Sequence, residues 1–469
     1  MFIGRQEELE FLEDKYKSKK GELVVIYGRR RIGKTETIRK FCENKNSIFY
    51  TCIECPDEQQ LSSFSIKILQ KNIPAAKYID RFLNWEQAFK SILEISTAEK
   101  IILVIDEFPY MVRANNSIPS ILQNLWDEIL KDKNIMIILC GSAMSFMEKE
   151  ILAEKNPLYG RATGILKMNE MNFYDSIKFV PNYSPADKIM TYAILGGIPH
   201  YLKQFDDNIS LKENIKKNIL TKGSILYSEV EFLLRQELRE TSIYNVIIEA
   251  IALGNTKLND IFQKTHIEKT KLSSYLKNLM DLGIVCREFS MEEKLKEQAN
   301  IQRGLYRLTD KFFRFWYAFV FPNMSELEIG DSEGIYEYMV KSELDHYTSY
   351  IFEDVCKEYL RLKNRRNELP FHFIKIGRWW NKTDELDIMA VDLKNKNFIL
   401  GECKYRNSAF ALSDLTAMKK KFIPQNPDYH LYYWIFSKGG FTQDVINTAQ
   451  EENIKIITME EIINLDDKK

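Results

Sequence analysis

Short apolar runs alternate with amphipathic stretches along the first third of the chain. Four of these runs are rich in β-branched residues and are bounded by turn or polar residues, at 21–28, 46–53, 100–107 and 134–141. The stretches between them keep the helical spacing of apolar positions. Strands that alternate with helices form a parallel sheet with helices on both faces. Residues 1–165 are therefore predicted to be an α/β domain built on a parallel sheet.

The remaining residues divide into further segments. Residues 166–238 have mostly helical patterns, broken by Gly-Gly-Ile-Pro at 196–199, and residues 239–321 contain short helical patterns followed by a hairpin-like stretch. The polar, acidic segment 322–334 is the expected linker. Residues 335–469 return to mixed α/β patterns. The whole chain is thus expected to be an α/β protein with several domains.

Composition limits where the protein works and what it binds. The chain has 469 residues, of which 45% are hydrophobic and 12% aromatic, and this suits packed domains rather than disorder. Its net charge is -1, so any contact with nucleic acid must come from a local basic patch. No apolar run approaches the length of a membrane span, the first residues do not resemble a secretory signal, and the cysteines are scattered. We therefore expect a cytoplasmic protein without a membrane partner.

An octapeptide at 28–35, Gly-Arg-Arg-Arg-Ile-Gly-Lys-Thr, fits the phosphate-binding pattern G-x-x-x-x-G-K-[ST] between a predicted strand and a predicted helix. Gly28 and Gly33 allow the backbone N–H groups to surround phosphates. Lys34 would reach the β- and γ-phosphates, and Thr35 would bind Mg²⁺. The motif predicts ATP and Mg²⁺ as cofactors, although it does not separate ATP from GTP.

The next buried run ends in acidic residues. Asp106 matches the carboxylate that holds Mg²⁺ in P-loop enzymes, and Glu107 is the candidate to orient the attacking water. Arg161 has two interpretations. It is either a sensor or arginine finger that stabilises phosphoryl charge, or one half of a loop salt bridge. A finger that acts across a subunit contact would imply a homo-oligomer.

Several stretches together resemble one family. FIGRQEELEFL, YGRRRIGKT, VIDEFPY, LCGSAMSFM, PLYGR and GGIPHYL are similar to segments of archaeal and bacterial AAA+ and STAND-type ATPases. The resemblance covers roughly residues 1–320 and implies an ATPase core followed by a winged helix. It also implies that Ser142 occupies the sensor position that faces the γ-phosphate. Gly4 and Arg5 would lie beside the nucleotide, and Pro199 would mark a helical lid.

Residues 256–290 have the pattern of a helix-turn-helix followed by a strand. In such a unit the second helix can enter the major groove of DNA, and here Lys269, Lys271 and Lys277 would face outward. Residues 255–303 hold nine basic and seven acidic residues, whereas specific DNA readers are usually more basic. DNA contact and a packing role within the chain therefore remain equal alternatives.

An acid and a lysine two residues apart end a buried run at Ile-Leu-Gly-Glu-Cys-Lys. Glu402 and Lys404 would therefore share one face of a strand, with Cys403 facing outward on the other side. Asp387 begins the preceding strand, and Glu353 lies on an amphipathic helix before it. This order of residues resembles the PD-(D/E)xK nuclease superfamily.

That resemblance implies a restriction-endonuclease-like domain at the C-terminal end. Asp387 and Glu402 would bind Mg²⁺, Glu353 would complete the metal shell, and Lys404 would position or activate water. Arg378, just before the site, would contact a nucleic-acid backbone. The alternative is a degenerate domain that only binds nucleic acid or protein partners.

The leading hypothesis is an Mg²⁺-dependent ATPase whose nucleotide state controls the nuclease-like domain through the winged helix. One alternative is an ATP-dependent oligomerisation switch or scaffold with an inactive adaptor domain. Another is a DNA-binding regulator that acts through the winged helix. The expected domains are a P-loop ATPase core at 1–165, a helical lid at 166–238, a winged helix-turn-helix at 239–321 and a nuclease-like domain at 335–469.

Overall fold

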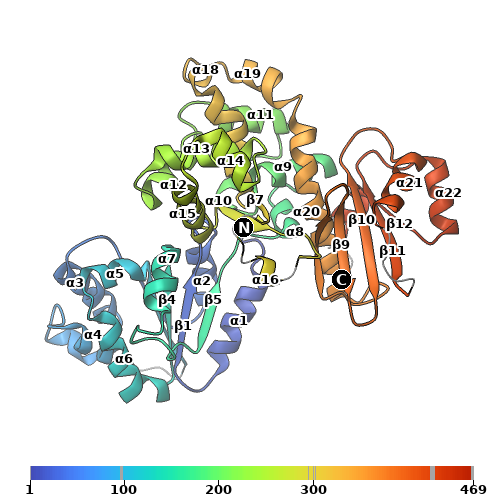
Figure 1. Ribbon diagram of the computed structural model, residues 1–469. Helices are drawn as coiled ribbons and strands as arrows, with labels where there is room; N and C mark the ends of the chain where they lie inside the picture. Colours follow the sequence, from blue (N-terminus) through green and yellow to red (C-terminus); the bar gives the residue numbers. More distant parts are fainter. Residues whose placement is uncertain are drawn as a thin grey trace. The chain divides into compact units, whose positions relative to one another are not determined.

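Two compact units make up the chain (Figure 1). The computed structural model describes residues 2–95, 99–293, 295–298, 300, 303–422 and 428–465. The first unit runs to Met171 and includes residues 198–200, whereas the second contains residues 172–197 and the chain from Tyr201 onward. The segment expected as a separate lid is therefore divided, and most of it belongs to the same unit as the C-terminal half.

A five-stranded parallel sheet forms the centre of the first unit, as the alternation of strands and helices predicts. The strands lie in the order β2–β3–β4–β1–β5, and every pair is parallel. Their bounds are β1 Glu22–Tyr27, β2 Ser47–Thr51, β3 Ile101–Asp106, β4 Ile135–Gly141 and β5 Gly164–Lys167. The first four coincide with the predicted runs, and the α/β fold class with a P-loop type of sheet is confirmed.

Helices bury both faces of this sheet. Val24 and Ile26 of β1 face one core, together with apolar residues of α1 and α2, whereas Leu23 and Val25 face a second core with the other helices. Because successive side chains of a strand point to opposite faces, a strand buried on both sides needs a continuous apolar run. The helices are α1 Gln6–Lys17, α2 Lys34–Cys42, α3 Asp57–Leu69, α4 Trp85–Ser91, α5 Phe108–Ala114, α6 Ile118–Glu128 and α7 Met144–Phe146.

Helices also dominate the first half of the second unit. A short antiparallel pair, β6 (Val285–Glu288) and β7 (Leu305–Leu308), follows α15 there. The helix α10 (Pro199–Leu202) begins among the residues of the first unit. The other helices are α8 Phe173–Ile177, α9 Pro185–Leu195, α11 Leu211–Ile215, α12 Glu229–Glu237, α13 Thr241–Ala252, α14 Leu258–Thr265, α15 Lys269–Asp281, α16 Leu295–Gln298 and α17 Lys311–Phe315.

The acidic segment at 322–334 is not a linker, contrary to the sequence-based expectation. It forms α18 (Met324–Glu328) and α19 (Ser332–Ile335), and the side chains of Leu327 and Ile335 are buried. Glu333 forms ion pairs with Lys212 and Lys216 of the same unit. The segment is polar because its acidic side chains meet lysines at the surface, while its few apolar residues attach it to the core.

A mixed five-stranded sheet forms the C-terminal half of the second unit. Its order is β12–β11–β10–β9–β8; β8, β9 and β10 are antiparallel, and β10, β11 and β12 are parallel. The meander predicted for 371–405 is thus present. The strands are β8 Lys375–Trp380, β9 Glu385–Asp392, β10 Asn397–Lys404, β11 His430–Ser437 and β12 Lys455–Thr458, and the helices are α20 Leu344–Arg365, α21 Leu412–Lys421, α22 Gln443–Glu451 and α23 Met459–Ile463.

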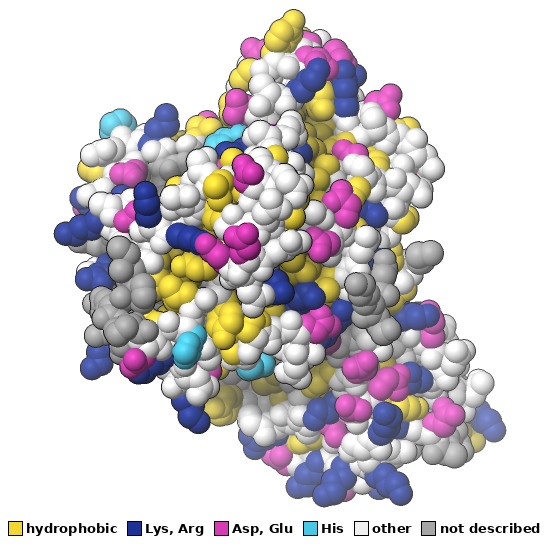
Figure 2. All heavy atoms as spheres, turned by 90° about the vertical axis from the view of Figure 1, so that its right-hand side faces the viewer, with side chains coloured by type: hydrophobic (Ala, Val, Ile, Leu, Met, Phe, Trp, Pro, Cys, Tyr) yellow, Lys and Arg dark blue, Asp and Glu magenta, His cyan; other side chains and the backbone are white. Residues whose placement is uncertain are grey.

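Surface character agrees with the near-zero net charge. Figure 2 shows basic and acidic side chains mixed over the face it presents, without a field of one sign. Within the described ranges, none of the helices combines the length and the apolar character that a membrane crossing requires.

Candidate functional site

The predicted phosphate loop joins β1 to α2, and its glycines have conformations that other residues rarely adopt. Gly33 has a φ of 92° and directly precedes the first residue of α2. A Cβ atom at Gly28 would lie 2.3 Å from the carbonyl oxygen of Met168, so only glycine fits there. Glycine at these two positions lets the loop turn tightly before a helix N-terminus, which is the setting that favours phosphate.

The Lys34 ammonium is held inside this loop. It donates hydrogen bonds to the carbonyl oxygens of Gly28 at 2.9 Å and Arg29 at 2.8 Å, and its side chain is buried. Burial lowers the pKa of Lys34, while the nearby Asp106 and Glu107 carboxylates oppose that shift. The loop therefore keeps a cation directed at its own centre, where phosphate oxygens would be its natural partners.

Thr35 and Ser142 contact the two acidic residues at the end of β3, Asp106 and Glu107. The hydroxyl of Thr35 donates to Asp106 Oδ2 at 2.9 Å, and the hydroxyl of Ser142 donates to Glu107 Oε2 at 2.8 Å. A hydroxyl and a carboxylate in contact are the protein ligands that Mg²⁺ takes in P-loop sites, so this donor set fits Mg²⁺. The segments after three neighbouring strands, β1, β3 and β4, thus bring together five of the predicted residues: Lys34, Thr35, Asp106, Glu107 and Ser142.

Two further segments implied by the resemblance lie beside the loop. Arg5 has a φ of 66° and donates from its guanidinium to the carbonyl oxygen of Ile32 at 2.7 Å. Pro199 lies 3.7 Å from the place where a Cβ atom on Gly33 would stand. The expectation that the Gly-Arg start and the Gly-Gly-Ile-Pro segment border the nucleotide site is consistent with these contacts.

Arg161 lies at the end of the same sheet where the strands begin, opposite to the end that holds the phosphate loop. It precedes β5, whose first residue pairs with Val24 near the start of β1, whereas the phosphate loop follows the end of β1. The six residues of β1 span roughly 20 Å between these two ends of the sheet. Arg161 forms an ion pair with Asp127 of α6 at 2.9 Å. This position argues against a sensor on the same chain; the loop salt bridge is present, and a finger on a neighbouring subunit stays a prediction.

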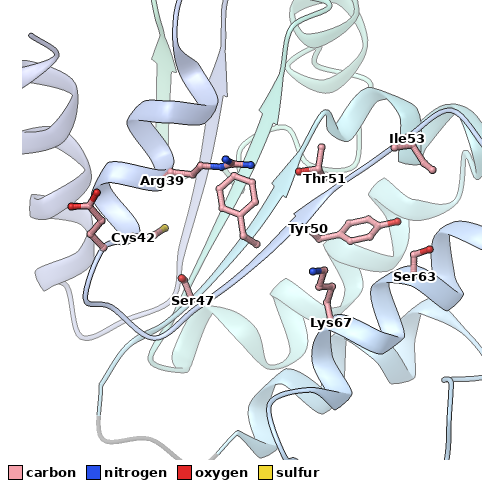
Figure 3. Close-up of a pocket in the computed structure, with 10 residues that line it drawn as sticks. Arg39, Cys42, Ser47, Tyr50, Thr51, Ile53, Ser63 and Lys67 are labelled. Carbon is pink, nitrogen blue, oxygen red and sulfur yellow. The ribbon is translucent and has the colours of Figure 1, made fainter. Parts of the chain in front are cut away.

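A cavity of about 650 Å³ opens along β2, the edge strand of this sheet (Figure 3). Its lining includes Arg39 and Cys42 of α2, Tyr50 of β2 and Lys67 of α3. Neither Lys34 nor the acidic strand end contributes to it. The cavity is therefore separate from the nucleotide loop.

The helix-turn-helix pattern folds into α14 and α15. Leu272, Leu276 and Leu279 of α15 are buried, and the three lysines predicted to face outward are exposed. We call these three residues the α15 lysines: Lys269, Lys271 and Lys277. The amphipathic prediction is confirmed, while the nucleic-acid role of the α15 lysines stays a prediction.

The chain that follows β6 docks on β8, the edge strand of the C-terminal sheet. The backbone N–H of Met291 donates to the carbonyl oxygen of Arg378 at 3.0 Å. The Ser290 hydroxyl donates to the Trp380 carbonyl at 2.9 Å and accepts from the Trp380 N–H at 3.0 Å. Backbone pairing of this kind covers a sheet edge that would otherwise be exposed. The hairpin region therefore has a packing role within the chain.

Arg378, which was predicted to contact nucleic acid, lies among carboxylates of its own chain. Only 12% of its side chain is exposed. Its guanidinium lies 3.3 Å from Glu353 of α20, 3.5 Å from Glu288 of β6 and 3.2 Å from Glu385 of β9. Sequence reasoning placed Arg378 outward because it precedes the site, but the docked hairpin closes over it and three carboxylates neutralise it.

The acid and lysine residues predicted for the C-terminal site meet where β9 and β10 lie side by side. Asp387 Oδ2 accepts a hydrogen bond from the backbone N–H of Cys403 at 2.8 Å, and the Lys404 ammonium lies 2.6 Å from Glu402 Oε1. Lys421, at the end of α21, lies 2.8 Å from both oxygens of Glu402. Sequence spacing did not indicate Lys421, because nothing distinguishes it from its neighbours in a run of three lysines.

Burial and mutual repulsion govern the charges at this C-terminal site. Burial, and then the Glu402 charge, raise the pKa of Asp387. Burial, and then the Asp387 charge, raise the pKa of Glu353, with Arg378 opposing the shift. Burial lowers the pKa of Lys404, but the Glu402 carboxylate outweighs it and raises that pKa overall. The carboxylates thus crowd one another, which a cation between them would relieve.

The donor set of this site fits Mg²⁺, but the ligands are not gathered into a closed shell. Asp387 and Glu402 offer the carboxylate oxygens that Mg²⁺ prefers. Within the described ranges, however, no three His, Cys, Asp or Glu side chains come close enough together to hold a metal ion. Glu353, Asp387 and Glu402, the predicted metal ligands, therefore lie in one region of the domain but do not form a metal centre in this structure.

Cys403 does not face outward, contrary to the sequence-based expectation. Its side chain is buried and interacts with the buried side chain of Cys356 on α20. Burial raises the pKa of both thiols. The strand is covered on both faces, so the residue between Glu402 and Lys404 belongs to the core.

Two family models match different parts of the chain. Residues 2–205 match a family described as an ATPase domain predominantly from Archaea. Residues 316–420 match a family described as archaeal and bacterial proteins of unknown function. The first range contains the phosphate loop and the acidic end of β3, and the second contains Glu353, Asp387, Glu402 and Lys404.

One curated relative covers nearly the whole chain. Uncharacterized protein MJECL04 of Methanocaldococcus jannaschii is 34% identical over 446 residues, which are 93% of this chain and 96% of that protein. Uncharacterized ATP-binding protein MJ0423 of the same organism is 60% identical over 45 residues, 10% of this chain and 76% of that protein. The chain therefore belongs to the family of MJECL04, and its first unit is a P-loop ATPase domain that binds and hydrolyses ATP.

A solved structure has a similar fold. The Walker-type ATPase PABY2304 of Pyrococcus abyssi matches 67% of this chain and 96% of its own, with a TM-score of 0.50 and 21% identity. At this level of identity the likeness supports the fold alone.

Proposed function

We propose that this chain is an Mg²⁺-dependent ATPase whose nucleotide state controls a nucleic-acid-cleaving site in the C-terminal domain. The proposed cleaving site rests on one observation: Asp387, Glu402 and Lys404 lie together at the adjoining ends of β9 and β10. Glu353 of α20 interacts electrostatically with Asp387. These are the residue types that metal-dependent phosphodiester hydrolysis needs, because they hold a cation and position water.

The residues of the first unit divide the ATPase reaction among them. Lys34 binds phosphate oxygens, and Thr35 and Asp106 hold Mg²⁺, which neutralises charge on the phosphates. Glu107 accepts a hydrogen bond from Ser142 in this structure, so its carboxylate is held at the end of β3. We assign Glu107 to orienting the attacking water and Ser142 to keeping Glu107 in place until the γ-phosphate is bound.

The C-terminal residues divide a hydrolytic reaction in a similar way. Asp387 and Glu402 hold the metal ion, which stabilises charge on the phosphodiester when bound. Lys404 is 31% exposed, so its ammonium can reach a substrate phosphate while it still contacts Glu402. The α15 lysines are exposed on the helix-turn-helix unit and would contact the nucleic-acid backbone.

The test is cleavage of DNA and RNA by the full chain with Mg²⁺ or Mn²⁺, with and without ATP. Asp387→Ala and Lys404→Ala are expected to abolish cleavage, and Lys34→Ala to abolish its dependence on ATP. Lys396→Met, which removes an exposed lysine in the turn between β9 and β10, serves as the control. Cleavage that survives both Asp387→Ala and Lys404→Ala, or no cleavage under any condition, refutes the nuclease assignment.

A second function is favoured by one observation. Glu402 is held by two lysines, and a carboxylate that is already neutralised suits an inactive domain. In that case ATP would set an oligomeric state and the C-terminal domain would act as an adaptor, with Arg161 reaching a neighbouring subunit. Light scattering with ATP and with ADP tests this function, and a mass that is independent of nucleotide contradicts it.

A further inference from the structure

Two lysine ammonium groups from different elements contact the Glu402 carboxylate. Lys404 is on the same strand, at 2.6 Å from one oxygen, and Lys421 comes from the last position of α21, at 2.8 Å from each oxygen. Only 4% of the Glu402 side chain is exposed, against 31% for Lys404 and 24% for Lys421. Both oxygens of the buried acid are therefore occupied by a lysine that lies partly in solvent.

We propose that Lys421 is a positioning residue that controls cation binding at the C-terminal site. This inference rests on the proposed function of that site. A divalent ion needs an oxygen of Glu402, and Lys421 contacts both oxygens, so the ion competes with the ammonium of Lys421 for the carboxylate. Lys421 thereby keeps Glu402 oriented in the absence of metal and lowers the affinity of the site for Mg²⁺ or Mn²⁺.

The geometry separates Lys421 from Lys404. Lys404 contacts a single oxygen of Glu402 and follows it on the same strand face, so it can remain in place when an ion binds the other oxygen. Lys421 contacts both oxygens from a helix end, and its ammonium would repel a metal ion on Glu402 and compete with it for the carboxylate. The partly exposed side chain of Lys421 leaves it room to move away.

A neighbouring lysine offers a matched control. Lys419 lies on the same turn of α21 and is 29% exposed, but it forms an ion pair with Glu452 of α22 instead of Glu402. Removal of either lysine changes the net charge equally. A difference between the two variants therefore reports the contact with Glu402 rather than the overall charge.

The experiment measures Mn²⁺ binding without nucleotide, from the paramagnetic resonance signal of free Mn²⁺, in full chains that all carry Asp106→Asn to remove the metal ligand of the nucleotide site. The chain with this change alone is the wild-type reference for the C-terminal site. Lys421→Met is expected to bind Mn²⁺ about five- to tenfold more tightly than wild type, because a half-buried ion pair no longer competes. Lys421→Arg, which keeps the charge and both contacts, is expected to bind like wild type. Lys419→Met should change the affinity less than twofold, and Glu402→Gln should abolish binding.

The outcomes distinguish this inference from the proposed function. If Glu402→Gln abolishes binding but Lys421→Met does not tighten it, or if Lys421→Arg binds as tightly as Lys421→Met, the role of Lys421 is refuted and the metal site stands. If Mn²⁺ binding is unaffected by Glu402→Gln, or absent from every variant, the metal site fails and the inference fails with it.

Discussion

Replacement of Arg378 by methionine should loosen the contact between the hairpin region and the C-terminal sheet. The side chain is 12% exposed and lies 3.2–3.5 Å from three carboxylates. Methionine keeps much of the apolar length of arginine but leaves the carboxylates without their shared cation. Glu353 matters most, because it is 14% exposed and loses its ion pair, whereas Glu288 keeps a second partner in Arg307 at 3.7 Å.

The size of the effect follows from burial. Removing one partner of a buried ion pair costs about 3–5 kcal/mol, because the other charge stays buried and uncompensated. Glu385 is 62% exposed, and loss of an exposed pair costs at most about 1 kcal/mol. We therefore expect about 3 kcal/mol for Arg378→Met and less than about 1 kcal/mol for Glu385→Gln, which removes only the exposed partner.

Hydrogen exchange is the suitable assay, because a chain with two compact units does not unfold in one step. A local loss of 3 kcal/mol corresponds to about a hundredfold faster amide exchange. The increase should appear in peptides that contain β8 and residues 285–291, whereas α1 and β1 should keep their protection. If Arg378→Met accelerates exchange there no more than Glu385→Gln does, the buried network is not what holds the hairpin to the sheet.

Three further predictions concern other parts of the chain. Lys34→Ala should abolish ATP binding, whereas Glu107→Gln should retain binding but lower hydrolysis at least about a hundredfold; equal loss of binding in both would contradict the assignment of Glu107 to water. Burial raises the pKa of Glu358 above its usual 4.5, so its contribution to stability is full below pH 4.5 and is lost as the pH rises. The protection of α20, which contains Glu358, against hydrogen exchange at pH 5 and at pH 8, expressed as opening free energy, should therefore differ less in Glu358→Gln than in wild type, and an unchanged difference would refute this. Changing the α15 lysines to glutamine should weaken DNA binding and reduce its salt dependence by up to about three in log–log slope; an unchanged slope would leave α15 with a packing role.

Local patterns were sufficient for the elements of the first unit. Four strands of the parallel sheet and the phosphate loop follow from the sequence because each depends on neighbours along the chain. A strand buried on both faces has to be apolar throughout, and a tight turn before a helix needs glycine at Gly28 and Gly33. The meeting of Thr35 with Asp106 was also predictable, since the carboxyl ends of all strands in a parallel sheet lie at the same end of the sheet, and only β4 separates β1 from β3.

The sequence predicted which residues lie at the C-terminal site but not all of the contacts that they make. Asp387, Glu402 and Lys404 follow from their spacing on adjoining strands. Lys421 and the buried setting of Arg378 could not be predicted, because each contact depends on where a distant helix or hairpin packs. The separation of Arg161 from the phosphate loop has the same origin, since it depends on the strand order rather than on the sequence near the arginine.

The sequence by itself thus determined the strands, the amphipathic helices, the phosphate loop and the residue types of both sites, because periodicity and spacing act over a few residues. Only the tertiary structure decided that the chain after β6 closes the edge of β8, that Arg378 is neutralised by three carboxylates, and that Lys421 holds Glu402. These outcomes depend on which surfaces are buried against each other, and burial is what turns a charged residue from a solvated side chain into a fixed partner.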